Sequence, residues 1–503
     1  MLNKYPDWIS AIVSGIIVGV VYLPVHAGFL IYIGLVPLIH IWLNSDIKTS
    51  VKMSFMSAIT ANFIAFFWMG LNMGTSPIIA FASLIGSVLY LAIFWIINGA
   101  VITFLHQRLR IGLIIIPFSW VTMEYFRSFG PMGFPWADLA LTQVYYLPLI
   151  QTVDITGTAG IAFIICIVNV LIYLSLTEKK SNPFLIGAIL IITLVFGFGS
   201  WRMNSIEKQL VENDFSVAVI QPNVDPVKKW EKSFRNELVD LMDSLTVEAI
   251  KMEPDFILWP ESAIPAYLRL SVRFRRPIHQ RVKESGIPLL TGTVDLISDI
   301  NGSHYFNGAL LLKPDGSQQI YHKIILVPFA EYIPLSKKFP KLKKLNFGQG
   351  NFEHGREYTV FTVGSHRFSN MICYESSFPR LARKFVERGA EFLTIETNDG
   401  WSGNSPGAYQ HFAIAQLRAV ENRVPVVRSA NTGISGIISP TGKVLEQMAF
   451  YERGVIFGSL SFLSGNWQTV SGDIFSLICI LIGIGLVCWE WFKNREMIIG
   501  TKD

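Results

Sequence analysis

The sequence is poor in charged residues. Asp, Glu, Lys and Arg make up 16% of the 503 residues, whereas 51% are hydrophobic and the mean hydropathy is +0.41. Soluble domains carry roughly 25% charged residues. A wholly soluble protein is therefore excluded, and part of the chain is predicted to lie in lipid. The chain is also too long for one ordinary core, so two or more structural units are expected.

Cysteine is scarce as well. The chain has four cysteines without a closely spaced pair, which excludes a disulfide framework and a cysteine-based zinc site. Three of them, Cys166, Cys479 and Cys488, lie in long apolar runs and are predicted to be buried packing residues. The net charge of +5 is too mild to point to a nucleic-acid partner. No metal and no cofactor is expected.

Residues 1–200 consist of long apolar segments joined by short polar turns. Each segment is close to the ~20 residues needed to cross a bilayer. Spans are predicted near 8–25, 27–44, 53–72, 78–105, 111–128, 159–176 and 183–200, and an eighth near 471–491. The first segment is followed at once by a second, and no small-residue cleavage site precedes it. We therefore expect a retained span and not a cleaved signal peptide.

Positive charge marks every second joint between these segments. The joints carry Lys4, then Lys48 and Lys52, then Arg108 and Arg110, then Lys179 and Lys180. By the positive-inside rule these joints are cytoplasmic. Seven spans then place the residues after 200 on the outer side, and the eighth returns the chain to a basic tail. Eight spans with both termini inside are the consistent prediction.

Two details of this region stand out. Glu124 and Arg127 are three residues apart at the outer end of the fifth span, so they share a helix face and can pair. The loop 130–136 that follows is rich in Gly, Pro and aromatic residues. A structural ion pair beside an interfacial anchor is the preferred interpretation.

Residues 214–462 have a different character, in which β-branched runs alternate with amphipathic helices. Helices are predicted at 233–252, 272–285, 378–388 and 408–422. Strands are predicted at 216–221, 255–260, 288–294, 305–313, 319–326, 357–363, 367–373, 391–397, 425–438 and 443–460. This mixture indicates one α/β or α+β layered domain, tethered to the membrane at both ends. The predicted units are thus 1–200, 214–462 and 471–491.

Three side chains of this domain could together catalyse acyl transfer. Cys373 ends the apolar run 368–372, so its thiol is displayed where a strand meets a helix. Glu261 follows a strand and a proline, at the edge where open α/β sheets place their sites. Lys323 is a lone cation inside an apolar strand. A carboxylate can take the thiol proton, and a lysine can stabilise the thiolate and then the oxyanion.

These residues alone leave the arrangement open. Cys373 could be a small buried hydrophobe, and Lys323 an outward-facing strand lysine. A histidine could also act as the base, and the domain offers six: His279, His304, His322, His354, His366 and His411. His322 adjoins Lys323, but it points to the opposite face of the strand.

The order of the motifs resembles a known family. The runs around Glu261, Lys323 and Cys373 look like the Glu-Lys-Cys triad of the nitrilase superfamily, and nitrilase-like amidases are soluble. A nitrilase-like domain between seven spans and one resembles the apolipoprotein N-acyltransferases, over nearly the whole chain. The further matching motifs are Gln221-Pro222-Asn223 with Trp230, Asn307, Glu331, Asn398-Asp399-Gly400-Trp401, Gln410-His411, Arg418 to Arg423, and Asn431-Thr432-Gly433. Ser402 departs from the family, which more often has an aromatic residue there, and this bears on the acyl-chain entrance.

The resemblance implies a fold, a reaction and residue roles. The domain would be an αββα sandwich, with Cys373 as nucleophile, Glu261 as general base and Lys323 as oxyanion stabiliser. The residues implied to support them are Glu331, Tyr374, Glu375, Asn307 and Trp230. Cys373 would take an acyl chain from a membrane phospholipid as a thioester. The acyl group would then pass to the α-amine of the diacylglyceryl-cysteine of an apolipoprotein.

The segment 328–356 is a predicted lid. It mixes apolar side chains with five lysines: Lys337, Lys338, Lys341, Lys343 and Lys344. We expect it to dip toward the membrane, where its lysines would meet lipid phosphates. The alternative is a solvated basic loop.

Two other functions compete with N-acyl transfer. A membrane-tethered amidase acting on a small amide would share the triad, but it would leave seven spans without a use. A non-catalytic scaffold or transporter fits poorly with an intact triad and with spans that lack paired broken helices. The sequence therefore predicts a monomeric N-acyltransferase of the bacterial cytoplasmic (inner) membrane, with its catalytic domain on the periplasmic or outer side.

Overall fold

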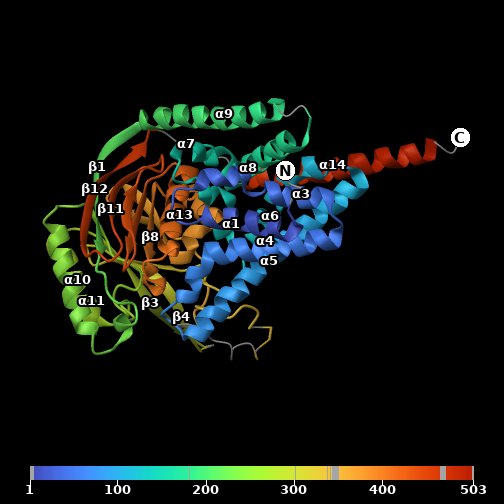
Figure 1. Cartoon of the computed structure of the whole chain (residues 1–503). Helices are drawn as coiled ribbons and strands as arrows, with labels where there is room; N and C mark the ends of the chain where they lie inside the picture. The colour runs from blue at the N-terminus through green and yellow to red at the C-terminus, as the bar shows by residue number, and fades with distance from the viewer. Residues whose placement is uncertain are drawn as a thin grey trace.

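The structure is a computed structural model that describes residues 5–179, 182–300, 302–336, 338–339, 341, 351–464 and 472–500. Its N-terminal part is a bundle of helices, and the strands gather on the other side of the molecule (Figure 1). The bundle contains α1 (Asp7–Val20), α2 (Ile31–Gly34), α3 (Val36–Asn44), α4 (Ile47–Phe66), α5 (Pro77–Leu109), α6 (Gly112–Arg127), α7 (Leu147–Ile150), α8 (Val153–Thr177) and α9 (Asn182–Glu207). The C-terminal helix α14 (Gly472–Gly500) runs along the bundle and projects beyond it.

Five helical stretches of the described chain are long and apolar enough to cross a membrane: Ile47–Leu71, Pro77–Leu109, Val153–Thr177, Asn182–Glu207 and Gly472–Asn494. The membrane helical domain predicted from the sequence is thereby confirmed. Helices α1 and α6 are shorter, with 14 and 16 residues. The predicted span 8–25 stops being helical at Val20, shortly before Pro24, which cannot donate a backbone hydrogen bond.

The predicted span 27–44 is a broken helix, because a side chain of α8 enters it. The N–H of Leu35 donates to Asn169 Oδ1 at 2.9 Å, and Asn169 Nδ2 donates to the carbonyl of Ile31 at 2.8 Å. In a regular helix, the groups of Leu35 and Ile31 would pair with each other. The fully buried amide of Asn169 therefore takes the place of one helical hydrogen bond and separates α2 from α3.

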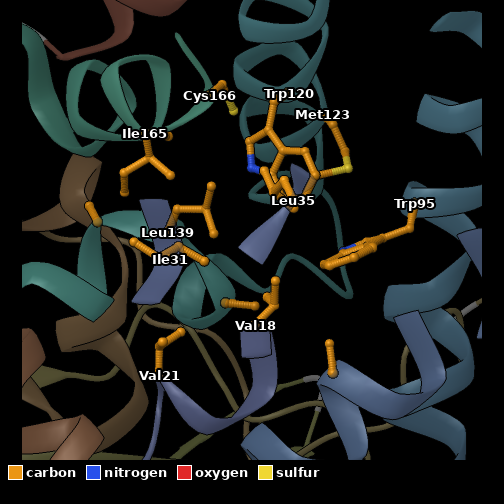
Figure 2. Packing of buried hydrophobic residues seen from close by; sticks show 14 of the residues in the cluster. Val18, Val21, Ile31, Leu35, Trp95, Trp120, Met123, Leu139, Ile165 and Cys166 are labelled. Atoms are coloured by element: carbon orange, nitrogen blue, oxygen red, sulfur yellow. The ribbon is translucent and has the colours of Figure 1, made fainter. Parts of the chain in front are cut away.

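The bundle core is apolar and closely packed. Leu35, Trp95 and Trp120 meet there, and the two indole rings lie 5.1 Å apart in an edge-to-face arrangement (Figure 2). Cys166 and Cys479 are buried, as predicted. Cys488, in the second half of α14, is exposed, so its prediction as a buried packing residue is wrong.

The part of the chain after the bundle contains two six-stranded sheets. The first has the order β12-β1-β2-β3-β4-β5 and the second the order β11-β10-β9-β8-β7-β6. The strands are β1 (Leu210–Gln221), β2 (Phe256–Leu258), β3 (Leu289–Asp299), β4 (Gly302–Leu312), β5 (Gln318–His322), β6 (Phe361–Val363), β7 (His366–Ile372), β8 (Phe392–Thr397), β9 (Val426–Ala430), β10 (Ser435–Ile438), β11 (Val444–Met448) and β12 (Gly454–Leu463). The helices are α10 (Arg235–Ile250), α11 (Val272–Ser285), α12 (Pro379–Glu387) and α13 (Pro406–Asn422).

The two sheets face each other across an apolar core. Phe256 of the first sheet contacts Phe368 and Phe392 of the second, with ring centroids 4.9 and 6.3 Å apart. Helices α10 and α11 cover the outer face of the first sheet, and α12 and α13 pack on the second. This four-layer order is the αββα sandwich predicted from the sequence.

Three strand predictions need correction. The runs 425–438 and 443–460 each form two strands, because the chain turns at Gly433 and again before Gly454, where φ is +157° in both cases. The run 319–326 ends as a strand at His322. Lys323 therefore lies one residue beyond β5 and not inside it, although its N–H still donates to the carbonyl of Asn307 at 2.8 Å.

Helix α13 lies between the second sheet and the bundle. Fourteen of its 17 residues are buried, so both of its faces are covered. Gln410 makes four hydrogen bonds to the bundle: Oε1 accepts from the indoles of Trp68 and Trp136, and Nε2 donates to the carbonyls of Tyr22 and Ala65. At the other end of α13, Arg423 donates to Asp154 at 2.9 Å. The sandwich is therefore fixed to the bundle through polar contacts that bury α13.

The loop 130–136 also joins the two parts. Trp136 is buried and lies against the His411 ring of α13, at a centroid distance of 4.9 Å. The interpretation of this loop as an interfacial anchor stays a prediction; its second half, with Trp136, packs under the sandwich. Glu124 and Arg127 lie 3.9 Å apart, as predicted, although Arg127 has a closer partner in Asp138 at 2.8 Å.

Candidate active site

Cys373 stands at a sharp elbow between β7 and α12. It follows Ile372, the last residue of β7, and begins a short 3-10 helix, Cys373–Ser377. Its φ is +51°, a region that residues with a Cβ adopt at a cost of about 1–3 kcal/mol. Two contacts hold the Cys373 carbonyl there: Ser376 Oγ donates to it at 2.9 Å, and His411 Nε2 lies 3.0 Å away. The thiol is thus presented at a strained and fixed position.

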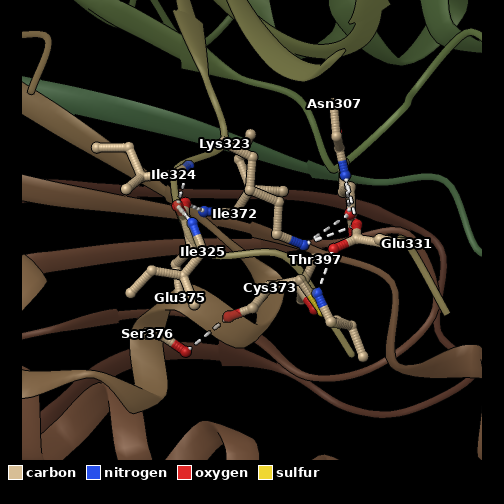
Figure 3. Close-up of polar contacts among 12 residues, drawn as sticks. Asn307, Lys323, Ile324, Ile325, Glu331, Ile372, Cys373, Glu375, Ser376 and Thr397 are labelled. Carbon is tan, nitrogen blue, oxygen red and sulfur yellow. Dashed lines mark hydrogen bonds and ion pairs between the residues drawn. The ribbon is translucent and has the colours of Figure 1, made fainter. Parts of the chain in front are cut away.

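Lys323 and three polar side chains form a cluster beside this elbow (Figure 3). Lys323 Nζ lies 2.9 Å from Glu331 Oε1 and 4.0 Å from Glu261 Oε1. Asn307 Nδ2 donates to both carboxylates, at 2.9 Å to Glu261 and 3.0 Å to Glu331. The structure therefore brings Glu261, Lys323, Glu331 and Asn307 together from segments far apart in the sequence.

Burial controls the ionisation of the cluster. Burial raises the pKa of Cys373 to about 12, and Glu261 adds to this effect, whereas Lys323 opposes it. Burial also raises the pKa of Glu261, against the opposing effect of Lys323. For Lys323 itself, burial lowers the pKa, but Glu331 and Glu261 outweigh it and the net direction is upward. The resting site thus holds a thiol beside a lysine that stays charged and a carboxylate that is a stronger base than usual.

Glu375 connects the lysine segment to the elbow. Its Oε1 accepts hydrogen bonds from Tyr321 Oη and from the N–H groups of Ile324 and Ile325, at 2.7–3.0 Å. Its Oε2 accepts from the N–H of Ile372 at 2.8 Å. Burial raises the pKa of Glu375 to about 7, and Lys323 and these N–H groups oppose that rise. One carboxylate therefore sets the spacing between the chain at Lys323 and the chain at Cys373.

The other predicted supporting residues have separate places. Tyr374 is buried, and its hydroxyl donates to the carbonyl of Gly133 in the bundle loop at 2.8 Å. Trp230 lies in the 3-10 helix Lys228–Trp230 and is 38% exposed. Its neighbour Lys229 reaches the site instead: Nζ donates to the main-chain carbonyl of Glu261 at 2.9 Å. Sequence reasoning missed Lys229, because nothing in the local sequence distinguishes it from Lys228.

The histidines considered as alternative bases take other positions. His411 contacts the carbonyl of Cys373 and also Asp399, at 2.8 Å, and it faces Arg428. His322 contacts Asp295 at 2.9 Å, on the side of the chain away from Lys323. Among the described residues, no group of three or more His, Cys, Asp or Glu side chains is arranged to hold a metal ion.

A cavity of about 920 Å³ adjoins the elbow, between the bundle and the sandwich. The bundle contributes α6 and the loop after it, and the sandwich contributes segment 324–336 and Tyr374. Apolar side chains dominate much of the wall: Tyr125, Phe129, Ile324, Ile325, Leu326, Tyr332, Ile333 and Phe378. Charged side chains of both signs also line it: Glu124, Asp138, Lys338, Glu353, Arg356, Arg380, Arg383, Lys384, Glu421 and Asp473. A hollow of this kind could take an apolar chain with a polar end.

Part of the predicted lid lines this cavity. Tyr332 donates a hydrogen bond to the carbonyl of Pro131, so the start of segment 328–356 touches the bundle loop. Lys337, Lys343 and Lys344 lie outside the described residues, as do 340, 342 and 345–350. The lid remains a prediction. Ser402 follows Trp401, whose carbonyl accepts from the N–H of Met73 at 2.7 Å, which places this turn against the bundle.

Two family models match the chain. One describes the N-terminal domain of apolipoprotein N-acyltransferases and matches residues 14–171, and the other describes carbon-nitrogen hydrolases and matches residues 216–464. The apolipoprotein N-acyltransferase of Geobacter metallireducens is 32% identical, over 98% of this chain and 96% of that protein. The apolipoprotein N-acyltransferase of Chlorobaculum tepidum is 30% identical, over 93% of this chain and 93% of that protein. A solved variant of the Nesterenkonia amidase, from the nitrilase superfamily, is 19% identical, with a TM-score of 0.38 over 50% of this chain and 92% of its own.

Proposed function

The chain belongs to the apolipoprotein N-acyltransferase family, and we propose that it moves a fatty acyl chain from a membrane phospholipid to the N-terminal α-amine of a diacylated apolipoprotein. We propose Cys373 as the nucleophile, Glu261 as the general base and Lys323 as the oxyanion stabiliser. Glu331 and Asn307 orient this group, and Tyr374, Glu375 and Trp230 support it. The observation that carries the proposal is the position of the Cys373 elbow beside a largely apolar cavity between the bundle and the sandwich, which reaches the elbow at Tyr374.

In the first half of the proposed reaction, Cys373 attacks an acyl ester of the phospholipid. Glu261 takes the thiol proton as the sulfur–carbon bond forms, and Lys323 stabilises the negative oxygen of the tetrahedral intermediate. The intermediate then expels the glycerol oxygen, which receives the proton from Glu261. A thioester on Cys373 and a lysophospholipid are left. The closeness of Lys323 to both carboxylates supports this division of roles.

In the second half, the α-amine of the apolipoprotein attacks the thioester carbonyl. Glu261 takes a proton from the attacking nitrogen, and Lys323 again stabilises the oxyanion. The carbon–sulfur bond breaks, an amide forms, and the thiol regains its proton. One nucleophile thus serves two substrates in turn, as in other ping-pong reactions.

Membrane attachment fits this pair of substrates, since both are held in lipid. Tethering the catalytic domain to the bilayer raises the effective concentration at which it meets them. We propose a seven-span domain over 1–200, an outer catalytic domain over 214–462 and a last span over 471–491. Both termini would be cytoplasmic in a bacterial inner membrane, and the enzyme would act as a monomer.

Intact mass of the purified protein after incubation with a phospholipid tests the first half-reaction. We expect a fatty-acyl increment on the wild type that neutral hydroxylamine releases, and none on Cys373→Ala. Alanine also carries a Cβ, so the strain at φ +51° is unchanged in this control. A diacylated peptide should then discharge the adduct. A chain that stays unmodified with phospholipid but hydrolyses small amides would favour the amidase function.

A further inference from the structure

Lys229 is a buried lysine beside the proposed base. It is 1% exposed, and its ammonium donates to the main-chain carbonyl of Glu261 at 2.9 Å. The loop that carries it is held in place: the N–H of Asn223 donates to the carbonyl of Asn431, and Asn431 Nδ2 donates to the carbonyl of Val224, both at 2.8 Å. The position of the ammonium is therefore built into the fold.

Two lysines, Lys323 and Lys229, act on the charge of Glu261. Two carboxylates, Glu261 and Glu331, share the cluster with one ammonium, that of Lys323. Lys323 lies 2.9 Å from Glu331 and 4.0 Å from Glu261, so the two carboxylates share its charge, and Lys323 is the main charge that opposes the raised pKa of Glu261. A buried carboxylate without its own counter-charge takes up a proton and loses its basicity. Lys229 supplies a second positive charge, which opposes the raised pKa of Glu261 less strongly than Lys323 does.

The other groups that face Glu261 do not fill this role. Asn307 is neutral, and the Cys373 thiol gives a proton to Glu261 in the proposed reaction. Glu396 lies fully buried in β8, where burial raises its pKa well above the ordinary value, and it carries no positive charge in any state. Burial lowers the pKa of Lys229 to about 8, although Glu261 opposes this. Lys229 is thus mostly charged at neutral pH.

We propose that Lys229 is a positioning residue whose ammonium fixes the main chain of Glu261 and balances its carboxylate, so that Glu261 is ionised when it takes the proton of Cys373. This inference rests on the proposed role of Glu261 as the base. Lys229 touches neither substrate nor the reacting atoms in this account. It acts through Glu261, on the pH at which the site becomes competent.

The test compares pH profiles of Cys373 reactivity in the full-length protein. Two readouts are used: thioester formation with phosphatidylethanolamine in detergent micelles, and alkylation of Cys373 by iodoacetamide, located by peptide mass. The variants are Lys229→Met, which removes the charge and the hydrogen bond, Lys229→Gln, which keeps a donor, and Lys229→Arg, which keeps the charge. Lys228→Met is the matched control, since Lys228 is the exposed neighbouring lysine.

We expect Lys229→Met and Lys229→Gln to move the acid limb of both profiles to higher pH by up to about one unit, because the loss of a nearby positive charge raises a carboxyl pKa. Lys229→Arg should keep the limb within a fraction of this shift, and Lys228→Met should leave it in place. If Lys229→Met lowers the rate but the acid limb does not move, the proposal is overturned, and the role of Lys229 is only to hold its loop in place. An acid limb that moves in Lys229→Met but not in Lys229→Gln would also overturn it, because the hydrogen bond alone would then account for the effect. A wild type that forms no thioester would refute the acyl-transfer role, and the alkylation profile would still decide on Lys229.

Discussion

Replacement of Gln410 by leucine should loosen the sandwich from the bundle. The leucine side chain has nearly the same size and shape, so the change removes polar contacts and little volume. It leaves four partners of the amide unpaired: the indole N–H groups of Trp68 and Trp136, and the carbonyls of Tyr22 and Ala65. Gln410 is 3% exposed, so water does not replace these contacts.

The size of the effect follows from those four groups. A buried polar group left without a partner costs about 1–3 kcal/mol, which gives about 4–12 kcal/mol for four. Removal of the buried amide itself returns part of this, and neighbouring losses do not add fully. We therefore expect Gln410→Leu to lower the free energy of unfolding by about 3–6 kcal/mol. Gln416→Leu is the matched control on the same helix: its amide makes one hydrogen bond, to the carbonyl of Gly442, so about 1 kcal/mol should be lost.

Thermal and denaturant unfolding in detergent would measure both variants. Hydrogen exchange would show where the loss falls: amides of α13 and the end of α4 should lose protection first, while the inner strands β7 and β8 keep theirs. Iodoacetamide should still alkylate Cys373, whereas thioester formation from phospholipid should drop, since the cavity needs both parts. Equal destabilisation by Gln410→Leu and Gln416→Leu would refute the reasoning.

Two further predictions concern buried carboxylates. Glu375→Gln should lower the rate of thioester formation about 100-fold, because the new amide nitrogen would face the N–H of Ile372 and displace the elbow. Single-turnover experiments read by intact mass would measure this rate. An unchanged rate would contradict the role given to Glu375. Asp154→Asn should lower the free energy of unfolding by about 3–5 kcal/mol, because Arg202 and Arg423 would both face a neutral amide. Denaturant unfolding would measure it. A loss no larger than that of an Asp→Asn change at an exposed position would contradict this account.

The sequence was sufficient to predict the helical bundle, the layers of the sandwich and the central residues of the candidate site. Apolar segments of membrane length and the alternation of strands with helices are local signals, and they led to the bundle and the sandwich. Cys373 and Glu261 were recognisable because each follows a short apolar strand. Their approach to Lys323 was expected from the resemblance to a family, since strand order cannot be read from spacing.

What the sequence could not reveal depends on contacts between distant segments. Lys229 and Lys228 are identical in type and adjacent, and burial beside Glu261, 32 residues later, distinguishes them. In the sequence, Asn169 is one polar residue in an apolar helix, and its role is visible only from its hydrogen bonds to Leu35 and Ile31. The long runs 425–438 and 443–460 read as single strands because β-branched residues continue close to their turns.

The break at Leu35 has a consequence for assembly of the protein in the membrane. Until α8 has been synthesised, the N–H of Leu35 and the carbonyl of Ile31 have no amide from Asn169 between them. In lipid, each such unpaired group costs several kcal/mol. The segment 28–44 therefore either forms a continuous helix at first and opens when α8 arrives, or stays in a wet environment until then. The broken form of this segment thus depends on a residue more than 130 positions downstream, so α2 and α3 reach their final arrangement only after α8 has been made.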